Sequence, residues 1–65
     1  MNLTINGATR TIMATDLAAL LAELQLDPAR VAIEHNGQIL RADQYVATGL
    51  AEGDRLEIVR FVGGG

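Results

Sequence analysis

The stretch TDLAALLAEL, residues 15–24, decides the fold of this chain because it is the clearest helix in the sequence. Its apolar residues recur at i, i+3, i+4 and i+7, a spacing that places them along one face of an α-helix. This stripe consists of Leu17, Leu20, Leu21 and Leu24. Thr15 or Asp16 caps the N-terminus. Residues 25–28 end the helix, because a residue before proline is pushed out of the α region and Pro28 cannot donate a hydrogen bond.

The segments on both sides of this helix alternate apolar and polar residues, as strands with one buried face do. Two pairs of strands meet at the dipeptides Asn6-Gly7 and Asn36-Gly37, which adopt positive φ at little cost in two-residue hairpin turns. The predicted strands are residues 1–5, 8–13, 31–34, 38–40 and 55–62. Since the helix has a single apolar stripe, it must lie across one face of the sheet that these strands form.

This order of elements predicts an α+β fold of the ubiquitin-like β-grasp class, with a mixed sheet of four to five strands and one main helix. Residues 41–52 lack periodicity and are expected to form an irregular crossover, anchored by Tyr45, Val46 and Leu50 and closed by a turn at Gly53-Asp54. The first and last strands pair in the middle of the sheet. We expect one domain, residues 1–62, and a flexible tail, residues 63–65. The predicted core consists of Leu17, Leu20, Leu21, Leu24, Val31, Ile33, Leu56 and Ile58.

The composition of the 65 residues excludes several kinds of chemistry. Cysteine is absent, so the chain has no disulfide, no thiolate metal site and no thiol that could hold a persulfide. Lysine is absent as well, which leaves no ε-amino group for conjugation. Eight acidic residues against five arginines give a net charge of −3, which argues against nucleic acid as a partner. No continuous apolar run is present, so we expect no signal peptide, no membrane partner and a cytoplasmic location.

The glycines at the end of the chain, Gly63, Gly64 and Gly65, are its most informative feature for function. Glycine keeps the backbone narrow and unhindered. A terminal carboxylate becomes a good electrophile only after a leaving group is attached, and adenylation by ATP supplies one. Side chains on the last residues would widen what must enter the ATP site. The simpler alternative is a frayed end without a function.

Other side chains carry weaker indications of a site. Val59 and Phe61 are expected on the sheet face away from the helix, where an antiparallel strand normally presents polar residues to water. Together with Val62 they are predicted to dock partner enzymes. His35 adjoins a turn without a catalytic partner and is expected to be ordinary loop surface. The acidic residues lack the spacing of a metal site and are expected to be solvated surface: Glu23, Asp27, Glu34, Asp43 and Asp54. No catalytic or metal-binding residue is predicted.

The leucine stripe, the segments VAIEHNGQIL (31–40) and LAEGDRLEIVRFVGGG (50–65), and the short length together resemble the ThiS family of thiazole-biosynthesis sulfur carriers. The resemblance implies a carrier that is a co-substrate and not an enzyme, and that binds no cofactor. It implies that Gly65 is adenylated by a ubiquitin-activating-enzyme-like adenylyltransferase at the expense of ATP. A persulfide sulfur donor then converts Gly65 to a thiocarboxylate, which thiazole synthase uses. Gly63 and Gly64 would be the segment that threads into the enzyme.

Three alternatives remain open at this point. The small subunit of molybdopterin synthase has a similar fold and glycine end but is typically longer. A ubiquitin-like protein modifier would use the same activated carboxylate on target lysines. A β-grasp binding module would use its sheet face, and the glycine end would then be incidental.

Overall fold

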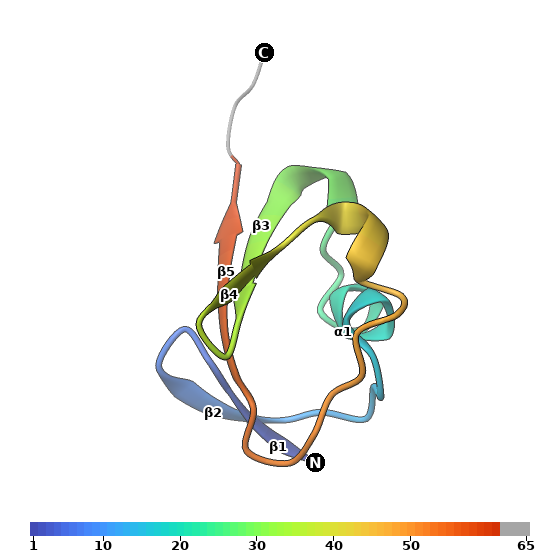
Figure 1. The fold of residues 1–65 in the computed structure, drawn as a ribbon. Helices are drawn as coiled ribbons and strands as arrows, with labels where there is room; N and C mark the ends of the chain where they lie inside the picture. The colour runs from blue at the N-terminus through green and yellow to red at the C-terminus, as the bar shows by residue number, and fades with distance from the viewer. Residues whose placement is uncertain (62–65) are drawn as a thin grey trace.

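The computed structural model describes residues 1–61, which form five strands, one α-helix and two short 3-10 helices (Figure 1). The strands are β1 Asn2–Ile5, β2 Ala8–Thr11, β3 Val31–His35, β4 Gln38–Leu40 and β5 Arg55–Arg60. The α-helix, α1, covers Leu17–Glu23, and the 3-10 helices cover Pro28–Arg30 and Ala42–Gln44.

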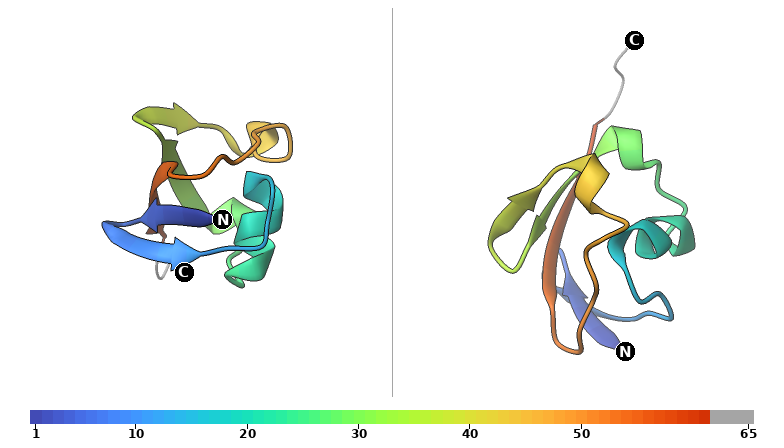
Figure 2. Two further views of the ribbon diagram at one scale, coloured as in Figure 1. Left: turned by 90° about the horizontal axis from the view of Figure 1, so that it is seen from below. Right: turned by 45° about the vertical axis from the view of Figure 1, so that its right-hand side comes forward.

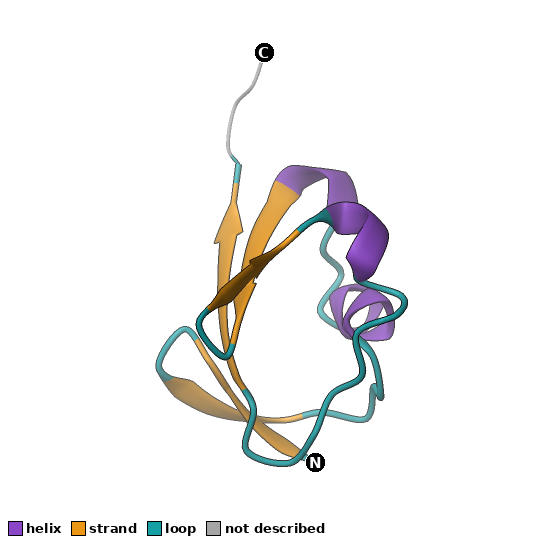
Figure 3. Ribbon diagram, viewed as in Figure 1, coloured by secondary structure: helices purple, strands orange, loops and turns teal. Residues whose placement is uncertain are grey.

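The strands form one mixed sheet in the order β2-β1-β5-β3-β4. β1 and β5 pair in parallel in its middle, and the other neighbours are antiparallel. α1 lies on one side of this sheet, and the crossover between β4 and β5 passes on the same side (Figure 2). Figure 3 shows that most of this crossover is loop. The predicted β-grasp fold is therefore confirmed. The N-terminus and the end of β5 lie at opposite ends of the molecule (Figure 1).

Both predicted hairpin turns are present. Asn6 and Gly7 have φ values of 51° and 83°, and Asn36 and Gly37 have φ values of 49° and 87°. Positive φ at both central residues is the signature of a type I′ turn, whose twist matches that of the flanking strands. The two turns thus set the registers of β1 with β2 and of β3 with β4.

Both ends of α1 lie close to where the sequence predicts them, but the cause given for the second end is wrong. Asp16 is the N-cap, and its carboxylate accepts a hydrogen bond of 2.8 Å from the Ala19 N–H. At the other end, proline does not stop the helix. The helix ends at Glu23, and Gln25 adopts a left-handed φ of 60°, so that the Leu26 N–H donates to the Leu21 carbonyl at 2.8 Å. This Schellman motif closes α1 before the proline, and Pro28 instead begins a 3-10 helix.

The core lies between α1 and the inner face of the sheet. All of the predicted core residues are buried except Leu24, which is partly buried against the same cluster. In the crossover, Tyr45 is 3% exposed, whereas Val46 is 70% exposed and is not an anchor. Tyr45 is the C-cap residue of the 3-10 helix Ala42–Gln44. The core also contains four residues outside the predicted list: Leu3, Ile5, Ile12 and Ala14. Alternation in residues 1–5 places Leu3 and Ile5 on one face, in agreement with their burial.

Within residues 1–61, no helix is long and apolar enough to cross a membrane.

Candidate functional site at the end of β5

β5 is held on both sides, and this positions the part of the chain that leads to the terminal glycines. On one side the β1–β5 register covers two residue pairs, Thr4↔Arg55 and Ile5↔Leu56. The Asn6 side chain then extends the ladder: its oxygen accepts from the Ile58 N–H at 2.8 Å, and its amide donates to the Ile58 carbonyl at 3.0 Å. On the other side, β3 pairs with β5 over five residues, from Val31↔Arg60 to His35↔Leu56.

The last described residue of the chain is tied to the 3-10 helix before β3. The Phe61 N–H donates to the Arg30 carbonyl at 2.8 Å, after β5 has ended at Arg60. The predicted strand, which ran to residue 62, is therefore too long, because Phe61 already lies outside β5. Val62, Gly63, Gly64 and Gly65 lie outside the described residues, and the roles predicted for them stay predictions.

The predicted exposure of Val59 and Phe61 is confirmed, at 59% and 58%, but the two side chains do not share one hollow. Val59 lines a hollow of about 170 Å³ together with Ile39, on the side of the sheet away from α1. Phe61 lines a different hollow, with Leu26, Arg30 and Arg60 among its other residues. Strict alternation no longer governs Phe61 because the strand ends one residue earlier.

The side of the sheet away from α1 carries side chains of β3, β4 and β5, and we call it the outer face. It consists of Ala32, Glu34, Ile39, Glu57 and Val59. Ile39 is 77% exposed, more than Val59 or Phe61. The sequence could have predicted that Ile39 lies on the outer face. The Asn36-Gly37 turn fixes the register of the hairpin, and Glu34 then pairs with Ile39.

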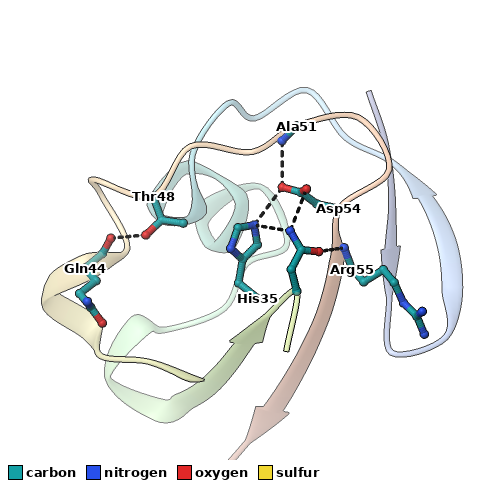
Figure 4. A network of polar contacts seen from close by, with 7 residues as sticks. His35, Gln44, Thr48, Ala51, Asp54 and Arg55 are labelled. Atoms are coloured by element: carbon teal, nitrogen blue, oxygen red, sulfur yellow. Dashed lines mark hydrogen bonds and ion pairs between the residues drawn. The ribbon is translucent and has the colours of Figure 1, made fainter. Parts of the chain in front are cut away.

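His35 and Asp54 form a polar network at the other end of β5 (Figure 4). His35 Nε2 lies 2.9 Å from Asp54 Oδ2, and these side chains are only 19% and 12% exposed. The Asn36 amide donates to Asp54 Oδ1 at 3.1 Å, and the Ala51 N–H donates to Asp54 Oδ2 at 2.9 Å. The prediction that His35 and Asp54 are ordinary surface is therefore wrong, because the turn at Gly53-Asp54 brings the carboxylate under the end of β3.

The network also changes the acidity of Asp54. Burial alone would raise the pKa of this carboxyl group, but hydrogen bonds from His35, Asn36 and the Ala51 N–H, with the charge of His35, lower the pKa below its ordinary value. Asp54 is an acceptor only, so His35 donates from Nε2. Within residues 1–61 no nucleophilic side chain contacts this pair, and no group of three metal-ligating side chains is present. The network therefore joins the β3–β4 hairpin to the start of β5.

Glu23 also differs from the solvated surface that was predicted for it. Its carboxylate accepts hydrogen bonds from the Met13 and Ala14 N–H groups, the latter at 2.8 Å. This contact joins the last turn of α1 to the segment that leads into the helix.

Comparison with known proteins identifies the relatives of this chain. A solved structure of the thiamine biosynthesis protein ThiS from Geobacter metallireducens is 35% identical, with a TM-score of 0.83 and full coverage of both chains. Sulfur carrier protein ThiS from Bacillus subtilis is 44% identical over 46 residues, which is 71% of this chain and 70% of that protein. A thiazole synthase from Paramagnetospirillum magneticum is 44% identical over the whole of this chain. A second thiazole synthase, from Magnetococcus marinus, is 38% identical over the same extent.

This chain spans only 20% of the length of each of the two thiazole synthases. Residues 3–65 match the sequence profile of the ThiS family, which is nearly the whole chain. The fold, the matched residues and the identity to these relatives agree, and the chain belongs to the ThiS family.

Proposed function

We propose that this protein is a sulfur carrier for thiazole formation in thiamine biosynthesis, and that its working group is the carboxylate of Gly65. The observation that carries the proposal is the course of β5, the central strand, which leads past exposed Val59 and Phe61 to three glycines in a ThiS-family chain. The chain has no cysteine, so it needs a group other than a thiol to hold sulfur.

The chemistry begins with activation. A carboxylate oxygen of Gly65 attacks the α-phosphorus of ATP on an adenylyltransferase of the ubiquitin-activating type, and pyrophosphate leaves. The terminal sulfur of a persulfide donor then attacks the acyl carbon, a C–S bond forms and AMP leaves. A thiol next cleaves the resulting acyl disulfide, so that a disulfide and the thiocarboxylate of Gly65 are released. The partner consumes the ATP, and the carrier itself is a co-substrate without a bound cofactor.

In this scheme residues 1–62 form the domain that partners recognise, and Gly63 and Gly64 are the threading segment. Glycine at both positions lets the carboxylate reach the α-phosphate without a side chain in the way. Val59, Phe61 and Val62 contribute to docking. Because ATP and a persulfide donor are consumed, we place the carrier in the cytoplasm.

The acceptor is thiazole synthase. The support is that two relatives carrying that name contain a segment 44% and 38% identical to this whole chain. A thiocarboxylate sulfur is a stronger nucleophile than a carboxylate oxygen, so it can attack an imine or ketone of the thiazole precursor. No observation favours a molybdopterin synthase subunit or a protein modifier over this assignment.

Intact-mass spectrometry tests the proposal. The 65-residue chain is incubated with the adenylyltransferase, ATP and a persulfide donor, and it should gain the mass of one sulfur-for-oxygen exchange. Deletion of Gly65 should abolish this gain while the free energy of unfolding stays the same, because glycine brings no side chain to the core.

Two further variants sharpen this result. A chain extended by one alanine after Gly65 should also fail, because the carboxylate is then displaced from the reacting position. Gly64→Ala should slow adenylation without lowering the melting temperature. Sulfur gain at a comparable rate in the deletion variant would show that the carrier assignment is wrong.

A further inference from the structure

Two glutamates on the outer face, Glu34 in β3 and Glu57 in β5, lie directly opposite each other in the antiparallel register. Both are exposed, and both line the hollow that Ile39 and Val59 line. Like charges directly opposite each other on neighbouring strands destabilise a sheet. The pair therefore opposes folding, and its role must be sought outside the free energy of folding.

Among the eight Asp and Glu side chains, all of which lie within residues 1–61, these two are the least satisfied. Each of the other six accepts at least one hydrogen bond within residues 1–61: Asp16, Glu23, Asp27, Asp43, Glu52 and Asp54. Glu34 and Glu57 accept none there, and neither takes part in an ion pair among these residues. Arg55 lines a neighbouring hollow with both glutamates, yet it pairs with neither. The pair is thus available to a cation from outside.

The apolar side chains beside the two carboxylates indicate which kind of cation fits the hollow. Ile39 and Val59 are 77% and 59% exposed and lie next to the two carboxylates around the hollow of about 170 Å³. An arginine or lysine side chain covers apolar surface with its stem while its charged head stays in a polar setting. The guanidinium group of arginine has five donors in a planar fork and can therefore bridge two carboxylates.

A second copy of this chain does not fit the outer face. Two copies related by a two-fold axis would bring the Glu34–Glu57 pairs of both chains together, and each chain has a net charge of −3. Juxtaposed like charges across an interface cost several kcal/mol. The occupant must instead present positive charge.

Of the partners proposed above, the adenylyltransferase is the one that we expect to present positive charge to this face, because it binds an anionic nucleotide. An enzyme that holds ATP surrounds its phosphates with cationic side chains and backbone N–H groups. An extended chain from Glu57 to Gly65 reaches at most about 29 Å, so an enzyme that binds the Gly65 carboxylate beside ATP also lies within reach of the outer face.

We propose that the outer face docks on the adenylyltransferase through an arginine of that enzyme, which lies over Ile39 and Val59 and pairs with both Glu34 and Glu57. This inference rests on the proposed function, because it assumes that the adenylyltransferase is a partner. The carboxylate pair then selects a basic partner and speeds encounter with it, at the expense of folding stability.

The test is calorimetric titration of the adenylyltransferase with the Glu34→Gln/Glu57→Gln variant at low and high salt. The affinity of this variant should be about tenfold lower than that of the unchanged chain at low salt, and its salt dependence should be weaker. Its melting temperature should be equal or higher, because the repulsion is removed. A matched control, Asp43→Asn/Glu52→Gln, removes two charges outside the hollow and should bind like the unchanged chain.

Adenylation assays separate this inference from the proposed function. Glu34→Gln/Glu57→Gln should need about tenfold more carrier to reach its half-maximal rate of pyrophosphate release, whereas the control variant should match the unchanged chain. Equal affinity of this variant and the unchanged chain at both salt concentrations would overturn the inference while adenylation of Gly65 stands. Equal loss of affinity in the control variant would overturn it as well, since general charge would then explain the effect. Failure of the unchanged chain to be adenylated would overturn the proposed function itself.

Discussion

On β5, Leu56 and Ile58 are 1% and 7% exposed, whereas Val59, the next residue along the strand, is 59% exposed. The inner side chains belong to the core beneath α1, and the outer ones meet water beside Glu34 and Glu57, which form no ion pair with any residue from 1 to 61. Alternation along one strand thus separates the residues that hold the domain together from those that are free to meet a partner. Substitutions on the two faces should consequently differ in what they change. The four predictions below test this contrast and the polar contacts that hold β5 in place.

The largest expected effect is on the inner face. Ile58→Ala should lower the free energy of unfolding by about 2 to 5 kcal/mol, because it leaves a cavity under the helix. Val59→Ala, one residue away, should change it by less than about 0.5 kcal/mol, as exposed positions usually do. Urea denaturation of both variants measures this difference, with Ile58→Val as a milder inner variant if Ile58→Ala does not fold. Similar losses in Ile58→Ala and Val59→Ala would refute the division into two faces.

The next effect concerns the polar support of β5. Asn6→Gly keeps the positive φ of the turn but removes the two hydrogen bonds to Ile58, and it should cost about 1 to 3 kcal/mol. The cost arises because the backbone groups of Ile58 lose their partners. Gly7 and the other residues of the turn stay unchanged in this variant. A free energy of unfolding equal to that of the unchanged chain would mean that water replaces the Asn6 amide at no cost.

The pH dependence of stability tests the network at the start of β5. The pKa of Asp54 is lower in the folded chain than in the unfolded chain. At pH values around these two pKa values, the folded state therefore binds fewer protons than the unfolded state. The stabilisation is therefore present above the unfolded pKa, near 3.8, and is lost as pH falls through the lower folded value. Urea denaturation between about pH 2 and pH 6 should show a smaller loss of stability on acidification in Asp54→Asn than in the unchanged chain. Parallel pH profiles for the two chains would contradict the role of this carboxylate.

The smallest expected effect on stability comes with an effect on binding. Phe61→Ala should leave the free energy of unfolding within about 0.5 kcal/mol, because the side chain is 58% exposed. The affinity of the Phe61→Ala variant for the adenylyltransferase should fall about tenfold, because truncation of an aromatic anchor commonly weakens binding to that extent. Val46→Ala, which also truncates an exposed apolar residue, is the control and should bind normally. Unaltered binding of Phe61→Ala in a calorimetric titration would return the residue to ordinary surface.

Several parts of the fold could be predicted because they depend on neighbours in the sequence. The Asn-Gly dipeptides predict their own turns through the φ values they tolerate, and the leucine spacing predicts the buried side of α1. The end of α1 is also local, and its position was predicted but its cause was not. Gln25 adopts a left-handed conformation that its residue type does not favour, and two hydrogen bonds accompany it: from the Gln25 N–H to the Ala22 carbonyl and from the Leu26 N–H to the Leu21 carbonyl.

The sequence by itself determined the β-grasp order, the inner and outer faces of β5 and the glycines that follow it, since periodicity and residue type encode all three. Only the tertiary structure decided that Asn6 supports Ile58, that His35 meets Asp54, and that Glu34 faces Glu57. These partners are 52, 19 and 23 residues apart, and their contact depends on how β1, β3 and β5 align. Pairing between distant strands follows from the packing of the whole sheet, which no short segment specifies.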